Sequence, residues 1–153
     1  MDLIFYVVLL LLIEMNYLFD ASLGIFIIRL LMGINMIGHS LPKLKDLKGV
    51  AKFMKGAGVP EGLTYATALL ELVGGIALIF GFLTRIAAIL FLLQFLSIVL
   101  YVKGIKMKSP YLMINNPAAS EIDVIYLIIS LVLIITGPGI YSIDYILKIP
   151  FYL

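Results

Sequence analysis

Five apolar runs divide this chain, and each is close to the roughly 20 residues that a helix needs to cross a lipid bilayer. A bilayer core offers no water to backbone N–H and C=O groups, so a spanning run has to satisfy them within a helix. The pattern therefore predicts an all-α integral membrane protein. The runs are Leu3 to Phe19, Ser22 to Leu41, Gly62 to Phe82, Arg85 to Val102 and Ile122 to Thr136.

The five runs leave little room for anything else in a chain of 153 residues, of which 63% are hydrophobic and 13% charged. We predict one membrane domain, 1–153, built as a four-helix transmembrane bundle with an additional N-terminal helix. The first run carries Glu14 and Asn16, and it lacks the basic start and small-residue cleavage site of a signal peptide. We therefore interpret it as a helix of the protein itself.

Cysteine is absent and histidine occurs once. Disulfides, thiolate zinc sites and cysteine-ligated iron–sulfur clusters are excluded, and no metal site is predicted. A redox role would need a bound organic cofactor or a partner subunit. The formal net charge of +2 is too small to indicate a nucleic-acid partner.

Lysines are concentrated in two connections that lie on the same side of the membrane if all five runs span it. Short loops rich in lysine stay in the cytoplasm. We predict a cytoplasmic amino terminus and an external carboxyl terminus. The lysines are Lys43, Lys45, Lys48, Lys52 and Lys55 in one loop, and Lys103, Lys106 and Lys108 in the other.

In residues 43–56, apolar residues recur at helical spacing along one face and lysines along the opposite face. This pattern predicts a basic amphipathic helix on the inner leaflet. A solvated loop is the alternative. The tail, 140–153, is rich in Ile and Tyr and is expected at the outer interface. Lipid headgroups are the expected partners of Lys45, Lys48, Lys52 and Lys55.

Four polar side chains fall near the membrane midplane when depth is counted along each run. We predict that Arg29 pairs with Glu71, with Glu14 as a second acceptor and Gln94 as a neutral hydrogen-bond partner. Two interpretations stand side by side: a ligand site, and a buried network that sets helix register.

Other residues have a structural and a functional interpretation. His39 is expected to cap the second run, or to exchange protons with a quinone headgroup. Gly74 and Gly75 thin the helix beside Glu71 for a neighbouring helix or a flat ligand. Interfacial positions are expected for Tyr101, Tyr111, Tyr126 and Tyr141, and exposed docking surfaces around Gly24, Gly33 and Ala87-Ala88.

Five motifs in order make residues 25–147 resemble the DoxX family of small membrane proteins. They are R-L-L-M-G from Arg29, H-S-L-P-K from His39, E-L-V-G-G from Glu71, G-F-L-T-R ending at Arg85, and G-P-G-I-Y-S-I-D from Gly137. The family has glycine where this chain has Ser40, and the first apolar run precedes the usual four-helix unit.

The resemblance implies a hydrophobic subunit of a membrane redox complex. The best-defined relatives, DoxD-type subunits, belong to the thiosulfate:quinone oxidoreductase of acidophilic archaea. Thiosulfate is a dianion, so Arg85 with Arg29 is the expected anion-binding pair. A quinone would need an apolar slot with a few polar groups, which Glu71, Gln94 and Glu14 could supply.

Three functions follow from these observations. The first is a quinone-interacting redox subunit with no intrinsic cofactor, and the second is a non-catalytic scaffold or assembly subunit of a respiratory complex. The third is a small solute or proton carrier, which would predict an internal repeat that the halves do not show. The first two predict other membrane subunits as partners.

Overall fold

The computed structural model describes residues 3–18, 21–56, 58–111 and 119–149, and within α1 the side chains of 4–11. Every regular element in these ranges is helical, which confirms the predicted all-α fold. The elements are α1 (Leu3–Leu18), α2 (Ala21–Lys45), α3 (Leu47–Gly56), α4 (Glu61–Phe80), α5 (Thr84–Ser97), the π-helical η1 (Ile98–Lys106), α6 (Glu121–Thr136) and α7 (Ile143–Ile146).

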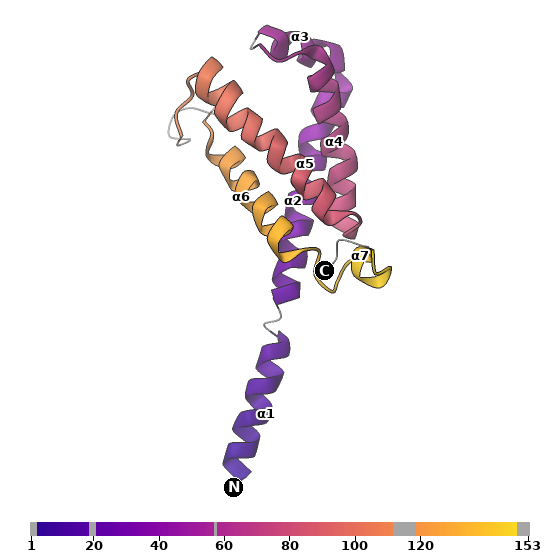
Figure 1. Ribbon diagram of the computed structural model, residues 1–153, viewed down its shortest axis with the longest axis vertical. Coiled ribbons are helices and arrows are strands. Elements are labelled where there is room, and N and C mark those ends of the chain that lie inside the picture. The colour runs from indigo at the N-terminus through magenta and orange to yellow at the C-terminus, as the bar shows by residue number, and fades with distance from the viewer. Residues whose placement is uncertain (1–2, 19–20, 57, 112–118, 150–153) are drawn as a thin grey trace.

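Four long elements run alternately up and down and form the bundle (Figure 1). α2 packs mainly on α4, and α5 packs mainly on α6. Three of the helices are long and apolar enough to cross a membrane: Ala21–Lys45, Glu61–Phe80 and Thr84–Lys106. That α1 and α6, at 16 residues each, also span remains a prediction.

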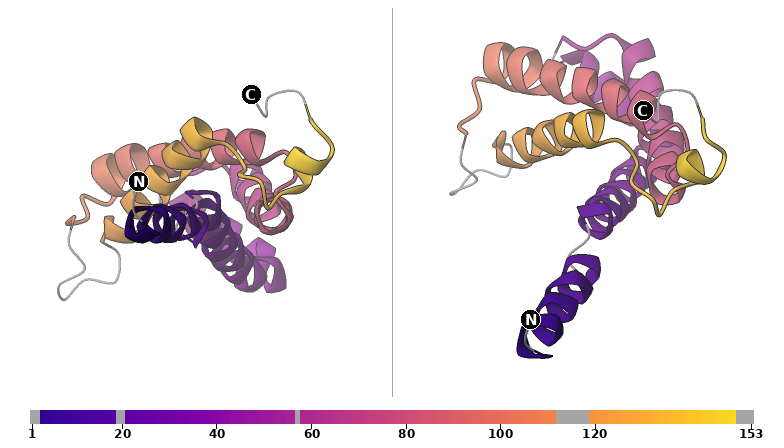
Figure 2. Two further views of the ribbon diagram at one scale, coloured as in Figure 1. Left: turned by 90° about the horizontal axis from the view of Figure 1, so that it is seen from below. Right: turned by 60° about the horizontal axis from the view of Figure 1, so that its bottom comes forward.

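α1 extends away from the bundle, beyond the start of α2 (Figures 1 and 2). The side chains of residues 4–11 are all exposed and apolar. A helix that is hydrophobic all round belongs in lipid or against another apolar surface. The placement of α1 agrees with its interpretation as an addition to the four-helix unit.

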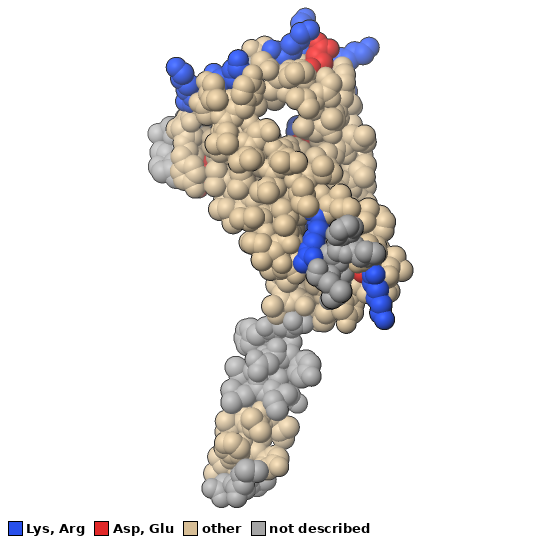
Figure 3. All heavy atoms as spheres, viewed as in Figure 1, with Lys and Arg blue, Asp and Glu red and all other residues tan. Residues whose placement is uncertain are grey.

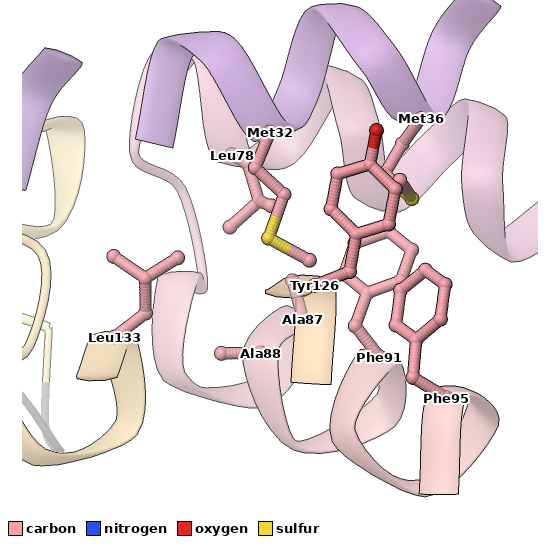
Figure 4. Packing of buried hydrophobic residues seen from close by; sticks show 9 residues of the cluster. All are labelled: Met32, Met36, Leu78, Ala87, Ala88, Phe91, Phe95, Tyr126 and Leu133. Atoms are coloured by element: carbon pink, nitrogen blue, oxygen red, sulfur yellow. The ribbon is translucent and has the colours of Figure 1, made fainter. Parts of the chain in front are cut away.

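The core is formed by side chains of α2, α4, α5 and α6 (Figure 4). The rings of Phe95 and Tyr126 lie 5.2 Å apart between centroids, and Phe91 stacks on Phe95 at 6.3 Å. Tyr126 is only 9% exposed, so its ring packs in the core of the bundle; that it lies at the level of the membrane interface remains a prediction. Its ring fills the space between α2 and α5 where smaller side chains would leave a void.

Two glycines set the register of α2 against α4. A Cβ added at Gly33 would lie 2.7 Å from the carbonyl oxygen of Gly75, and one at Gly75 would lie 2.9 Å from that of Gly33. Absence of side chains lets the two backbones approach closely. Gly33 is therefore not part of an exposed docking surface, and neither is Ala87-Ala88, which is buried in the core. Gly24 is exposed, with nothing within 4 Å of an added Cβ.

The segment predicted as one amphipathic helix, 43–56, belongs to two helices. α2 continues through Pro42 to Lys45, and α3 begins at Leu47. The lysines of α3 point outward, whereas Ala51 is buried and α3 packs on α4. Part of the apolar face expected to enter the bilayer is therefore used within the protein.

Candidate functional site

A lysine, a glutamate and a glutamine meet inside the bundle. The Nζ of Lys43 donates to both carboxylate oxygens of Glu71, at 2.6 and 2.7 Å, and the Nε2 of Gln94 donates to Glu71 Oε1 at 2.7 Å. The Glu71 side chain is 4% exposed and that of Lys43 is 31% exposed. Lys43 therefore links a buried carboxylate to the solvent side of the fold.

A cavity of about 450 Å³ lies beside this group. Its wall is largely aliphatic, and Lys43 and Gln94 contribute to it whereas Glu71 does not. The other lining residues are Val50, Met54, Val59, Pro60, Leu63, Thr64, Ala66, Thr67, Leu70, Leu90, Leu93, Ser97, Ile98, Tyr101 and Val102. Its size and lining are typical of sites for small apolar ligands.

The space-filling view shows an opening between α4 and α5, near the end of the molecule that carries α3 (Figure 3). A basic side chain is visible inside it, and lysines surround the same end of the molecule. The π-helical turns of η1 contribute Ile98, Tyr101 and Val102 to the cavity wall. π-helical turns are rare and are frequently found at functional sites.

Among the described residues, two buried polar atoms of cavity-lining side chains find no hydrogen-bond partner. They are the Oε1 of Gln94 and the Oγ1 of Thr64, and both are buried. An unpaired buried polar atom costs free energy, so native proteins rarely leave one without a water or ligand to bond. Both side chains stand in the wall of the cavity.

The predicted ion pair between Arg29 and Glu71 is wrong, because Glu71 pairs with Lys43. Arg29 lies four residues before Gly33, and Glu71 lies four residues before Gly75 on the antiparallel helix. The glycine contact thus places the two residues on opposite sides of the crossing, about 12 Å apart along the axis at a rise of about 1.5 Å per residue. A depth counted from the ends of each apolar run takes no account of this axial offset between α2 and α4.

Arg29 instead joins the helices at the other end of the bundle. Its Nη2 donates to the backbone oxygen of Tyr141 at 2.5 Å, and its guanidinium carbon lies 5.7 Å from the centre of the Phe26 ring. The side chain is fully buried against Gly81, where any Cβ would collide with Nη1. Gly81 has φ +67°, a left-handed conformation that favours glycine.

Asp144 completes this cluster at the end of the bundle away from α3, which we call the Arg29–Asp144 cluster. Its carboxylate accepts from the backbone N–H of Leu83 at 2.7 Å and of Thr84 at 2.8 Å, and its own N–H donates to the oxygen of Gly81 at 2.9 Å. A carboxylate at a helix N-terminus satisfies donors that have no partner in the helix. Asp144 thus fastens the C-terminal segment to the start of α5.

The remaining predicted site residues lie apart from the cavity. Arg85 packs beside Gly137, and its role in anion binding with Arg29 remains a prediction. His39 is exposed, with its ring 6.1 Å from that of Tyr126, and it does not end α2, which continues for six more residues. Glu14 lies on α1, but its side chain is outside the described residues.

The lysines of α3 are exposed, and basic side chains gather at the end of the molecule that carries α3 (Figure 3). Lys55 forms an exposed ion pair with Glu61 at 2.9 Å. Lys103 bridges to Asp123 at 2.5 Å and to the oxygen of Ala119 at 2.7 Å, which ties η1 to the start of α6. Lipid headgroup binding by Lys45, Lys48, Lys52 and Lys55 remains a prediction.

Sequence reasoning did not assign roles to Lys43, Thr64 or Asp144. Lys43 and Asp144 both stand in the motifs quoted above, H-S-L-P-K and G-P-G-I-Y-S-I-D, which was the available signal. Thr64 had no signal in one sequence. Among the described residues, no group of three or more His, Asp or Glu side chains lies close enough together to hold a metal ion.

Comparison with known proteins gives a family match and two relatives along most of the chain. The DoxX family model matches residues 24–104. A Bacillus subtilis (strain 168) protein named "Putative oxidoreductase CatD" is 31% identical over 130 residues, covering 85% of this chain and 90% of that protein. The "Inner membrane protein YqjF" of Escherichia coli (strain K12) is 34% identical over 133 residues, covering 83% and 94%. No solved structure matches the chain.

Proposed function

This chain belongs to the DoxX family, and from that premise we propose that it is a quinone-binding subunit of a membrane oxidoreductase. The observation that carries the proposal is the apolar cavity beside the Lys43–Glu71–Gln94 group. A quinone ring needs an apolar slot and a few polar groups at its oxygens. The name of the Bacillus relative supports an oxidoreductase setting.

Charge balance at the cavity favours a neutral ligand. Lys43 and Glu71 neutralise each other, and the other polar side chains in the wall carry no charge: Gln94, Thr64, Thr67, Ser97 and Tyr101. An anion such as thiosulfate would need uncompensated cations. A neutral ring with polar oxygen atoms matches this surface better than a dianion does.

Electron transfer requires a second component. The chain contains no cysteine and a single histidine, so it holds no cysteine-ligated cluster of its own. A quinone passes two electrons and two protons when it changes redox state, and the electrons would come from or go to a partner subunit. The role of this chain is then to hold the ring and to supply polar contacts at its oxygens.

The test is quinone binding by the full chain in lipid nanodiscs, with a blocked cavity as the comparison. Ala66→Phe places a phenyl ring in the cavity wall, whereas Leu69→Phe places the same ring at an exposed position of the same helix that does not line the cavity. We expect Ala66→Phe to weaken binding of a decyl-benzoquinone at least tenfold and Leu69→Phe to leave it unchanged. Equal binding by both variants, or no binding by the native protein, would overturn the proposal.

A non-catalytic scaffold is the second candidate, favoured by the two buried polar clusters that tie the helices together. Native mass spectrometry of the protein, mildly solubilised from its own membranes, separates the two functions. Stoichiometric quinone favours the proposed role. Stable partner subunits without quinone on this chain favour the scaffold.

A further inference from the structure

The amide of Gln94 has one permitted orientation in this site. Its nearest polar neighbour is the carboxylate of Glu71, which only accepts hydrogen bonds when ionised, and Lys43 Nζ already binds both of its oxygens. The amide must therefore turn its NH₂ toward Glu71, as the 2.7 Å contact from Nε2 to Oε1 shows. A flipped amide would place two oxygens against each other.

This orientation leaves the carbonyl oxygen of Gln94 as the unused half of the amide. The residue is 8% exposed and lines the cavity, and its buried Oε1 has no partner in the part of the chain that the structure describes. An amide oxygen is an acceptor only. A ligand that satisfies it must bring an O–H or N–H donor.

We infer that the cavity selects the reduced, hydroxyl-bearing form of its ring, the hydroquinone, over the oxidised quinone. The inference rests on the proposed function and specifies the redox form of its ligand. The two oxygens of a quinone are carbonyls and offer no donor, whereas those of a hydroquinone are hydroxyls. Gln94 is thus the specificity-determining residue, and Glu71 is the positioning residue that orients it.

The other polar groups of the cavity discriminate little between the two forms. The Thr64 hydroxyl also has no partner among the described residues, but it can either donate or accept, as can the hydroxyls of Thr67, Ser97 and Tyr101 in the wall. Lys43 can only donate, and both carbonyl and hydroxyl oxygens accept from it. Two of its N–H groups are already directed at Glu71. Selection therefore depends on the Gln94 oxygen.

Preference for the reduced form has a thermodynamic consequence. One hydrogen bond to an otherwise unpaired buried group corresponds to about a tenfold difference in affinity. Tighter binding of the reduced form raises the midpoint potential of the bound couple, by about 30 mV for a tenfold ratio in a two-electron couple.

Three probes test the inference on the native full chain in nanodiscs under anaerobic conditions. They are a decyl-benzoquinone, its hydroquinone, and the dimethyl ether of that hydroquinone, which keeps the ring but has no O–H. We expect the hydroquinone to bind about tenfold more tightly than the quinone, and the ether to bind no better than the quinone. Equal binding of the three, or tighter binding of the quinone, would overturn the inference while leaving the proposed function intact.

Gln94→Met provides the matched variant, because methionine has similar length and no acceptor amide. We expect the ratio of hydroquinone to quinone affinity to fall close to one, through loss of hydroquinone binding. An unchanged ratio in a variant that still binds the quinone would also contradict the inference. Failure of all three probes to bind the native chain would instead reject the proposed function, and the inference with it.

Discussion

Lys43 and Glu71 stand 28 positions apart in the chain, yet Lys43 Nζ lies within 2.7 Å of both carboxylate oxygens of Glu71. Lys43 reaches inward from the end of α2, past Pro42, to a carboxylate in the middle of α4. An unpaired carboxylate at the depth of Glu71 would be costly in lipid, and the positive charge of Lys43 neutralises it. It also determines which way the amide of Gln94 faces.

The ion pair should contribute to stability. Removing one partner of a buried pair costs roughly 3–5 kcal/mol, because the other charge stays buried. Since the Lys43 side chain is 31% exposed, we expect Lys43→Met to lower the free energy of unfolding by about 2 kcal/mol. Thermal unfolding in detergent micelles measures this, with the exposed Lys45→Met as a neutral control. The double variant Lys43→Met/Glu71→Leu should lose less than the sum of the single changes; additive losses would mean that the pair is not coupled.

Close packing of α2 on α4 should depend on both glycines of the crossing. Gly33→Ala places a Cβ 2.7 Å from the oxygen of Gly75, and the helices would have to separate at a cost of about 1–3 kcal/mol. Gly38→Ala is the matched control on the same helix, since nothing lies within 4 Å of its Cβ. We expect that control to stabilise slightly, because alanine favours helix over glycine. An unchanged free energy of unfolding in Gly33→Ala would show that the two helices are packed less closely than described.

Replacement of Asp144 should lower the free energy of unfolding more than replacement of an exposed aspartate that also caps a helix. Asp144→Ala removes the acceptor for the N–H groups of Leu83 and Thr84, at an expected cost of about 1–2 kcal/mol. Asp46 accepts from the N–H of Gly49 at 3.0 Å in an exposed position, and Asp46→Ala should cost about 0.5 kcal/mol, the low end of the range for a helix cap. Thermal unfolding of the two variants gives the comparison. Similar losses would contradict the role assigned to the Arg29–Asp144 cluster.

Membrane orientation can be measured directly, because the chain has no cysteine of its own. We expect Lys52→Cys to be labelled by an impermeant maleimide only after the cells are permeabilised. Lys148→Cys, at the other end of the bundle, should be labelled in intact cells. Labelling of both cysteines from the same side would reject the four-span arrangement, and the reverse pattern would reject the orientation.

Fold class followed from the chain alone, and so did the bounds of most helices to within a few residues. Long apolar runs have one solution in lipid, a helix, and glycine and proline mark the connections. Polar positions also proved informative, since Glu71 and Gln94 form the predicted hydrogen bond inside the bundle. Each of these inferences rests on residues close together in the chain, or on a requirement that any lipid-embedded polar residue meets.

Which charged side chains pair with each other across the bundle depends on the tertiary structure. Arg29 and Lys43 both lie on α2 and are both long cations, and nothing in their spacing shows which one reaches Glu71. The contact of Gly33 with Gly75 fixes the axial register of α2 against α4. In this register Lys43 pairs with Glu71. Arg29 instead bonds to the backbone of the C-terminal segment that carries Asp144. Hydropathy specifies which residues enter the membrane, but the relative height of two helices depends on where their surfaces permit closest approach.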